Sequence, residues 1–193
     1  MKSYVAAIAA VLICGTAAQA QTDDNRFHAS VLGGWTSHPD LTYGAARPGV
    51  DNSFNAGARA GVNLNGIVPW NGFSLDADYF YHQGDFQAPG AGTALSSHSF
   101  MGNLMYHAPM AERWGVYGGA GLGAVNTSVS GAANGTSTVF GWQALGGVEY
   151  AVRDNTSLFA EYRYQNAHNA NVAGVGPVGN TSNNLSMGVK ISF

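Results

Sequence analysis

The chain has few charged residues, one cysteine and, after its first twenty residues, no long apolar run. Charged residues make up 10% of the 193 residues, whereas about a quarter is usual in a soluble domain. A single cysteine allows no internal disulfide, and without about 20 consecutive apolar residues there is no membrane-spanning helix. Acidic residues outnumber basic ones by eleven to eight, so no basic surface for nucleic acid is expected.

The first twenty residues have the pattern of a secretory signal peptide. A positive charge at Lys2 precedes the short apolar run Val5–Ile13, and an A-x-A cleavage sequence ends at Ala20. We therefore expect residues 1–20 to be removed, which leaves residues 21–193 as one domain. Lipidation of Cys14 is the alternative, but Ile13 stands where a small residue would be needed. Removal of Cys14 leaves a chain without thiol chemistry or cysteine metal ligands.

Eight segments of the remaining chain alternate apolar and polar residues with a period of two, which is typical of β-strands. In Leu185–Phe193, for example, the apolar side chains share one face and Lys190 lies on the other. Each segment has roughly nine or more residues, enough to cross a bilayer as a tilted strand. Apolar outer faces around a polar interior predict an all-β fold, an eight-stranded antiparallel up-and-down transmembrane β-barrel. The segments are Arg26–Thr36, Ser53–Leu64, Gly72–Gln83, Ser97–His107, Arg113–Val125, Thr138–Val152, Thr156–Gln165 and Leu185–Phe193.

The connections between these segments alternate in length. The long ones are His38–Asn52, Gly84–Leu95, Asn126–Ser137 and Asn166–Asn183, and the short ones are Asn65–Asn71, Ala108–Glu112 and Arg153–Asn155. In an up-and-down barrel every second connection lies at the same end, so we expect extracellular long loops and periplasmic short turns. Two sets of aromatic residues fit the aromatic girdles that membrane barrels have at the two membrane interfaces. The group at the short turns is Trp70, Trp114 and Tyr150, and the group nearer the long loops is Trp35, Tyr81 and Trp142.

Nearly all charged residues within the predicted strands lie on the inner face, which in a barrel of eight strands is a narrow lumen. They are Arg59, Asp76, Asp78, Glu149, Glu161, Arg163 and Lys190. Because buried charges must be paired, we predict that these residues form a salt-bridge network that plugs the lumen. Inward glycines would make room for the long side chains, namely Gly57, Gly61, Gly115, Gly119, Gly121 and Gly123. A plugged lumen leaves no substrate cleft, and the six histidines have no metal-binding spacing, so we predict no catalytic site, cofactor or metal.

Three stretches carry a family resemblance: Ala18-Gln19-Ala20, Phe159–Tyr164 and Gly188–Phe193. With the strand pattern, they resemble the small outer-membrane β-barrels that include the OmpA transmembrane domain, OmpX-like proteins and porin-like surface antigens of alphaproteobacteria. The resemblance implies a monomeric, non-enzymatic protein of the bacterial outer membrane, in contact with lipid and lipopolysaccharide. Its expected roles are envelope structure, surface antigenicity, adhesion or interaction with host or surface ligands through the loops. The resemblance also implies that Phe193 is an assembly signal for the barrel-assembly machinery. No peptidoglycan-binding domain is expected after Phe193, so that function of OmpA is not carried over.

Three alternatives to a structural envelope role follow from particular residues. Ser96 and His98 share a face, as in the outer-membrane deacylases that modify lipid A, but the order of the pair is reversed and no carboxylate lies nearby on that face. A narrow gated pore would require the lumen pairs to rearrange. A soluble lipocalin-like calyx fits Gly33-Gly34-Trp35, but that fold turns its apolar face inward and ends with a helix.

Overall fold

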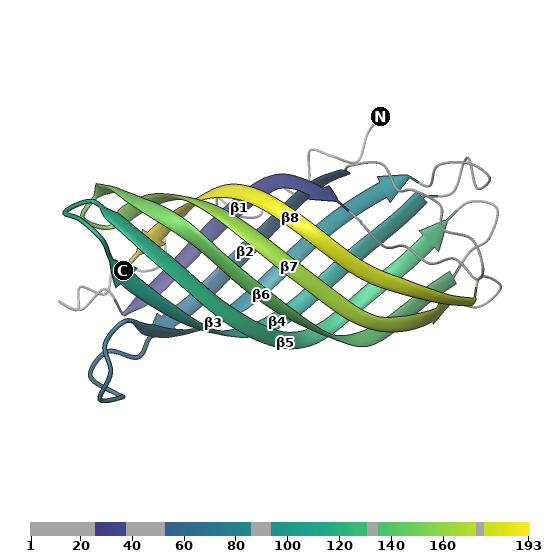
Figure 1. The fold of residues 1–193 in the computed structure, drawn as a ribbon, viewed down its shortest axis with the longest axis horizontal. Coiled ribbons are helices and arrows are strands. Elements are labelled where there is room, and N and C mark those ends of the chain that lie inside the picture. Colours follow the sequence, from purple (N-terminus) through teal and green to yellow (C-terminus); the bar gives the residue numbers. More distant parts are fainter. Residues whose placement is uncertain (1–25, 38–52, 86–93, 131–134, 173–175) are drawn as a thin grey trace.

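A computed structural model of the chain describes residues 26–37, 53–85, 94–130, 135–172 and 176–193. Eight antiparallel strands follow one another around a closed barrel in which the last strand pairs with the first (Figure 1). The predicted fold class is therefore confirmed. The predicted signal peptide and the segment His38–Asn52 lie outside the described residues. The strands are β1 (Phe27–Ser37), β2 (Ser53–Asn63), β3 (Phe73–Asp85), β4 (Ala94–Pro109), β5 (Trp114–Ser130), β6 (Gly135–Arg153), β7 (Thr156–Val172) and β8 (Gly176–Ser192).

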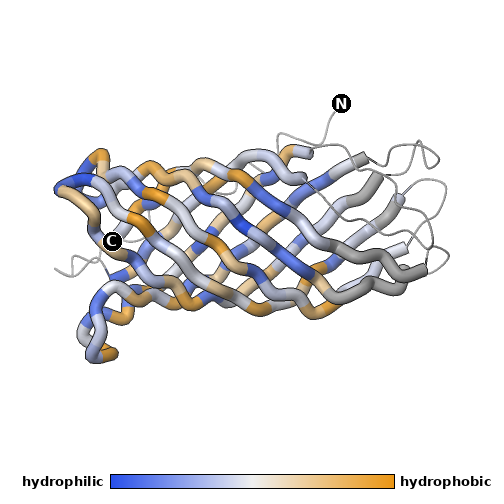
Figure 2. Tube along the Cα trace, in the orientation of Figure 1, coloured by the Kyte–Doolittle hydropathy of each residue, from blue (hydrophilic) through white to orange (hydrophobic). Residues whose placement is uncertain are grey.

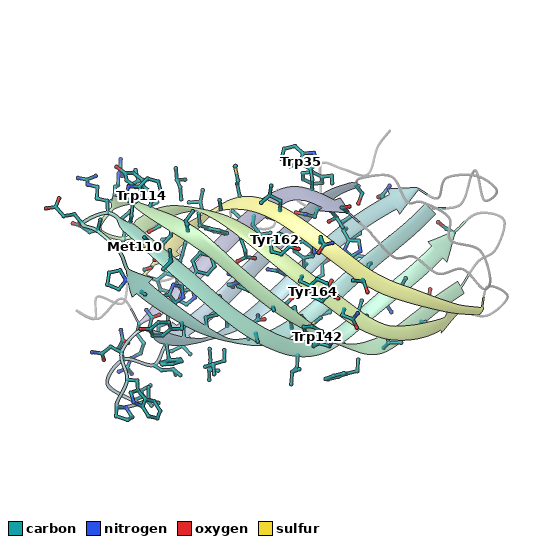
Figure 3. The ribbon with its side chains drawn as sticks, in the orientation of Figure 1. Trp35, Met110, Trp114, Trp142, Tyr162 and Tyr164 are labelled. Carbon is teal, nitrogen blue, oxygen red and sulfur yellow. The ribbon has the colours of Figure 1, made fainter. Side chains whose placement is uncertain are left out.

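The period of two in the sequence becomes an outer and an inner face. On β8, Leu185 and Met187 are exposed on the outside, whereas Ser186 between them is 3% exposed and lies in the lumen. Apolar and polar residues accordingly alternate along the strands in Figure 2, and Figure 3 shows Trp35 standing outside the wall. Exposed apolar side chains on every strand suit contact with lipid rather than water. Among the described residues, no helix is long and apolar enough to cross a membrane.

The strands β5 to β8 are longer than predicted, with 17 to 19 residues each. The interpretation of Asn126–Ser137 and Asn166–Asn183 as loops is therefore wrong, because most of both segments continues the strands. Their composition of Asn, Ser, Thr and Gly is typical of loops, but at the described positions such residues lie on both faces of paired strands. On the outer face Asn126 donates a hydrogen bond to Thr138 (2.8 Å), and Asn166 donates one to Thr181 (2.9 Å). This polar extension continues the barrel beyond its apolar band.

The lumen is filled by apolar as well as polar side chains. Two buried apolar clusters lie inside it, one around Phe80 and Met105 and a smaller one around Met101 and Val125. The predicted inward glycines face these and other large side chains. A Cβ atom at Gly61, for example, would collide with the side chains of His28 and Asp76. Over the described residues the interior is therefore filled with packed side chains, as expected of a barrel of eight strands.

Candidate functional site

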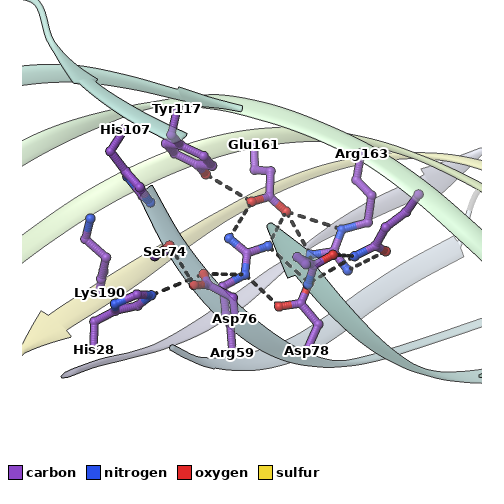
Figure 4. A network of polar contacts seen from close by, with 12 residues as sticks. His28, Arg59, Ser74, Asp76, Asp78, His107, Tyr117, Glu161, Arg163 and Lys190 are labelled. Carbon is purple, nitrogen blue, oxygen red and sulfur yellow. Dashed lines mark hydrogen bonds and ion pairs between the residues drawn. The ribbon is translucent and has the colours of Figure 1, made fainter. Parts of the chain in front are cut away.

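Four charged residues form a plug across the middle of the lumen (Figure 4). Arg59 on β2 lies directly opposite Asp78 on β3 in the strand register, and its Nε donates a hydrogen bond to Asp78 Oδ1 over 2.6 Å. The same guanidinium reaches across the barrel to β7, where its Nη1 donates to Glu161 Oε2 over 2.9 Å. Arg59 therefore bridges two carboxylates that belong to distant parts of the sequence.

Arg163 completes the plug from β7. Its Nη2 lies 2.9 Å from Glu161 Oε1 and 2.9 Å from Asp78 Oδ2, and its guanidinium lies over the Phe80 ring at 4.4 Å. Two arginines thus share two carboxylates, and the group has no net charge. All four side chains are buried, with 7% or less of each residue exposed. Such a group is stable only while every charge keeps its partners, because an unpaired charge in the lumen has lost its hydration without compensation.

Neutral side chains complete the hydrogen bonding of the plug. The Tyr117 hydroxyl donates to Glu161 Oε2 over 3.1 Å. The Gln143 amide donates to Asp78 Oδ2 over 3.2 Å and to Asn103 Oδ1 over 2.6 Å. With these residues the network connects six consecutive strands, β2 to β7. The plug therefore links opposite walls of the barrel as well as closing the lumen.

Asp76 belongs to the edge of this network on the side of the short turns. Its Oδ2 lies 3.1 Å from His28 Nε2 and 3.9 Å from Arg59 Nε, and its Oδ1 accepts a hydrogen bond from the Ser74 hydroxyl over 2.7 Å. Asp76 is thus held by a histidine, an arginine and a serine.

Glu149 and Lys190 form a separate ion pair, nearer the short turns and half-buried. His107 lies beside them, with its Nδ1 3.9 Å from Glu149 Oε1. The space between this pair and the plug has a volume of about 10 Å³, roughly the room for one water molecule. The lumen thus remains narrow on this side of the plug.

Five of the seven residues singled out in the sequence therefore come together in one network, and the other two make a pair of their own. The five are Arg59, Asp76, Asp78, Glu161 and Arg163. The sequence interpretation missed His28 and Tyr117, which complete the network. Each lies at an inward position of its strand, so the alternation along β1 and β5 would have identified both.

Ser96 and His98, both of which the structure describes, do not have the arrangement expected of a deacylase. Among the described residues, no three histidine, cysteine, aspartate or glutamate side chains are grouped to hold a metal ion. The His98 ring has its Nδ1 2.8 Å from the Tyr79 hydroxyl and packs against the Tyr81 ring at 4.8 Å. The partner of His98 is therefore a phenol, where a catalytic triad would have a carboxylate.

Comparison with known proteins agrees with the β-barrel fold. The family model described as the outer membrane protein β-barrel domain matches residues 6–193. None of the curated proteins matches the chain. The structure of Neisserial surface protein A is similar, with a TM-score of 0.67 and 25% identity over 90% of this chain and 100% of that chain.

Two further solved structures share the fold alone, since their sequence identity is low. OprG from Pseudomonas aeruginosa has a TM-score of 0.57 and 14% identity, over 87% of this chain and 96% of that chain. A major outer membrane protein from Thermus thermophilus has a TM-score of 0.56 and 10% identity, over 87% of this chain and 98% of that chain.

Proposed function

The chain belongs to the outer-membrane protein β-barrel family, and on this premise we propose that it is a non-enzymatic, non-conducting envelope protein that acts through its surface-exposed end. In this proposal residues 1–20 direct export, and Phe193 serves the barrel-assembly machinery as an assembly signal. The folded barrel acts as a monomer in contact with outer-membrane lipid and lipopolysaccharide. Its extracellular segments interact with host or surface ligands.

The ionic plug is the observation that carries this proposal. An eight-stranded barrel has an interior just wide enough for side chains, and here two arginines and two carboxylates fill it at one level. Passage of a solute would separate these buried pairs and leave charges without partners. Among the described residues, the space beside the plug has room for about one water molecule, so a substrate would find no cleft there. In this proposal, the outer surface of the barrel and its connecting segments are therefore the sites that interact with other molecules.

The polar extension of β5 to β8 supports a role at the extracellular end. Its outer face presents uncharged hydroxyl and amide groups above the apolar band, including Ser128, Thr136 and Asn183. Such groups suit contact with water and with lipopolysaccharide sugars rather than with acyl chains. The name of the similar Neisserial surface protein A also agrees with display at the cell surface.

Cysteine labelling of intact cells tests the proposed display. Ala45→Cys lies between β1 and β2, and Ala111→Cys lies in the short connection between β4 and β5 as a matched control. We expect a membrane-impermeant maleimide to label Ala45→Cys in intact cells and Ala111→Cys only after lysis, with the unchanged protein as the blank. Labelling of Ala111→Cys alone in intact cells, or of neither variant before lysis, would contradict the proposal.

A further inference from the structure

The connection between β2 and β3, Leu64–Gly72, differs from the other described connections at the short-turn end. It is longer than residues 110–113 and 154–155, and it contains no charged residue, whereas those two contain Glu112, Arg113 and Asp154. It displays two large apolar side chains, since Ile67 is 60% exposed and Trp70 is 67% exposed, whereas residues 110–113 display one, Met110. An uncharged connection with exposed apolar groups is unusual for a turn that faces only water.

Hydrogen bonds hold this connection in a defined shape. The backbone amides of Ile67 and Val68 donate to the Leu64 carbonyl over 2.9 and 3.1 Å. The Gly72 amide donates to the Asn65 side chain over 2.9 Å, and Gly72 has a positive φ of 91° that other residues rarely adopt. The exposure of the apolar side chains is therefore a property of an ordered turn.

The connection extends sideways from the barrel. Figure 1 shows it at the lower left, where it reaches past the outline of the wall at the end that holds the C-terminus. Figure 2 shows apolar residues at its tip. Because the barrel axis runs along the membrane normal, a sideways extension at this end lies over the membrane plane and not over the lumen.

The exposed side chains continue the lipid-facing surface of the barrel. Phe73 follows the connection directly, and its ring pairs with Tyr106 on β4 at 5.0 Å. Trp114 on β5, labelled in Figure 3 at the same end as Met110, pairs with Tyr150 at 4.9 Å. Aromatic side chains concentrate at the membrane–water interface. The connection thus adjoins an aromatic band at the periplasmic edge of the wall.

We infer that Leu64–Gly72 is a lateral membrane anchor whose Ile67 and Trp70 insert into the periplasmic leaflet of phospholipids. Continuity with the lipid-facing wall, the sideways direction and the lack of charge all favour lipid as the occupant. A periplasmic protein that docks on the turn is the competing occupant. The anchor widens the apolar outline of the barrel on one side, at β2 and β3.

Depth-dependent fluorescence quenching of single-tryptophan variants tests this inference. The variant Trp35→Phe/Trp114→Phe/Trp142→Phe keeps only Trp70, and Trp35→Phe/Trp70→Phe/Trp142→Phe keeps Trp114 as the wall control. Both are refolded into phospholipid nanodiscs, with folding checked by heat-modifiable gel migration. We expect lipids brominated near the glycerol to quench Trp70 within about twofold of Trp114. Trp70 that is unquenched by these lipids, and as open to acrylamide as a free tryptophan derivative, would overturn the inference.

A second measurement keeps all four tryptophans and therefore does not depend on the multiple substitutions. Asn71→Cys, beside Trp70, and Ala111→Cys, in the charged turn, are labelled with the same polarity-sensitive dye. We expect the dye at position 71 to emit at shorter wavelength in nanodiscs than the dye at position 111. Emission from position 71 at the long wavelength that the dye has in water would mean that this turn lies in water and would reject the anchor.

Discussion

Replacement of Glu161 by glutamine isolates the role of charge in the plug, because the amide keeps the size of the side chain. Glu161 is 1% exposed and accepts hydrogen bonds from Arg59, Arg163 and Tyr117. Without its charge, the two guanidinium groups keep Asp78, which both of them contact, and Arg59 also keeps Asp76, whose Oδ2 lies 3.9 Å from its Nε. Arg163 then shares its one remaining carboxylate, Asp78, with Arg59, and removing a partner from a buried ion pair costs about 3–5 kcal/mol of unfolding free energy.

A second substitution tests whether this cost comes from the lost carboxylate partner of Arg163. Arg163→Met in the Glu161→Gln background returns the four plug residues to equal numbers of positive and negative charges and leaves the Arg59–Asp78 pair at 2.6 Å. The double variant should therefore lose less stability than the sum of the single variants, by about 0.5–3 kcal/mol. Ser186→Ala is the matched control, because this lumen residue donates one neutral hydrogen bond to Asn55 (3.0 Å) and its loss costs about 1 kcal/mol.

Urea unfolding of the protein in phospholipid vesicles provides the free energies, with tryptophan fluorescence as the signal. Heat-modifiable gel migration gives the folded fraction of each variant independently. The reasoning is refuted if Glu161→Gln costs no more than Ser186→Ala, or if the double variant loses the full sum of the two single losses. Either result would mean that the four charges are not coupled in the way that their distances indicate.

Three further predictions concern the wall and its closure. In the same urea assay, Gly61→Val should cost about 1–3 kcal/mol because it drives a side chain into the histidine–aspartate pair. Gly102→Val on the lipid face should change little, because a Cβ atom there would meet only the Leu122 carbonyl oxygen at 4.0 Å. Ala120→Arg in the apolar band should cost about 2–4 kcal/mol, and Ser128→Arg on the polar extension about 0–1 kcal/mol. Equal effects within either pair would contradict the assigned faces. Deletion of Phe193 removes two backbone hydrogen bonds to β1 and should lower the heat-modifiable protein recovered in outer-membrane fractions, and unchanged recovery would count against its role in assembly.

The strands and their faces could be predicted because lipid outside and a packed lumen inside impose a period of two on the sequence. In Leu185–Phe193 this pattern is complete, and the structure places each side chain on its predicted face. The ends of the strands that lie opposite the short turns could not be predicted in the same way. Beyond the apolar band both faces are polar, so pairs such as Asn126–Thr138 follow a strand without any alternation. Judged by composition alone, these polar strand ends resemble loops.

The charged residues of the lumen could be predicted, but their partners could not. Alternation assigns Arg59 and Glu161 to the inner face, whereas the stagger between strands decides which side chains meet across the barrel. Glu149 and Lys190 illustrate this limit, since they lie on the same face as the plug and yet pair with each other. The apolar part of the lumen was missed for a related reason. Residues such as Phe80 interrupt a polar inner face, and only the packing of the closed barrel shows that Arg163 lies over its ring.

Conductance of the purified protein in planar lipid bilayers tests the central claim, a barrel closed by its ionic plug, most directly. The protein should give no stepwise conductance in preparations whose heat-modifiable migration shows complete folding. Regular steps of uniform size from such preparations would mean that the plug opens, and would contradict the proposed non-conducting role.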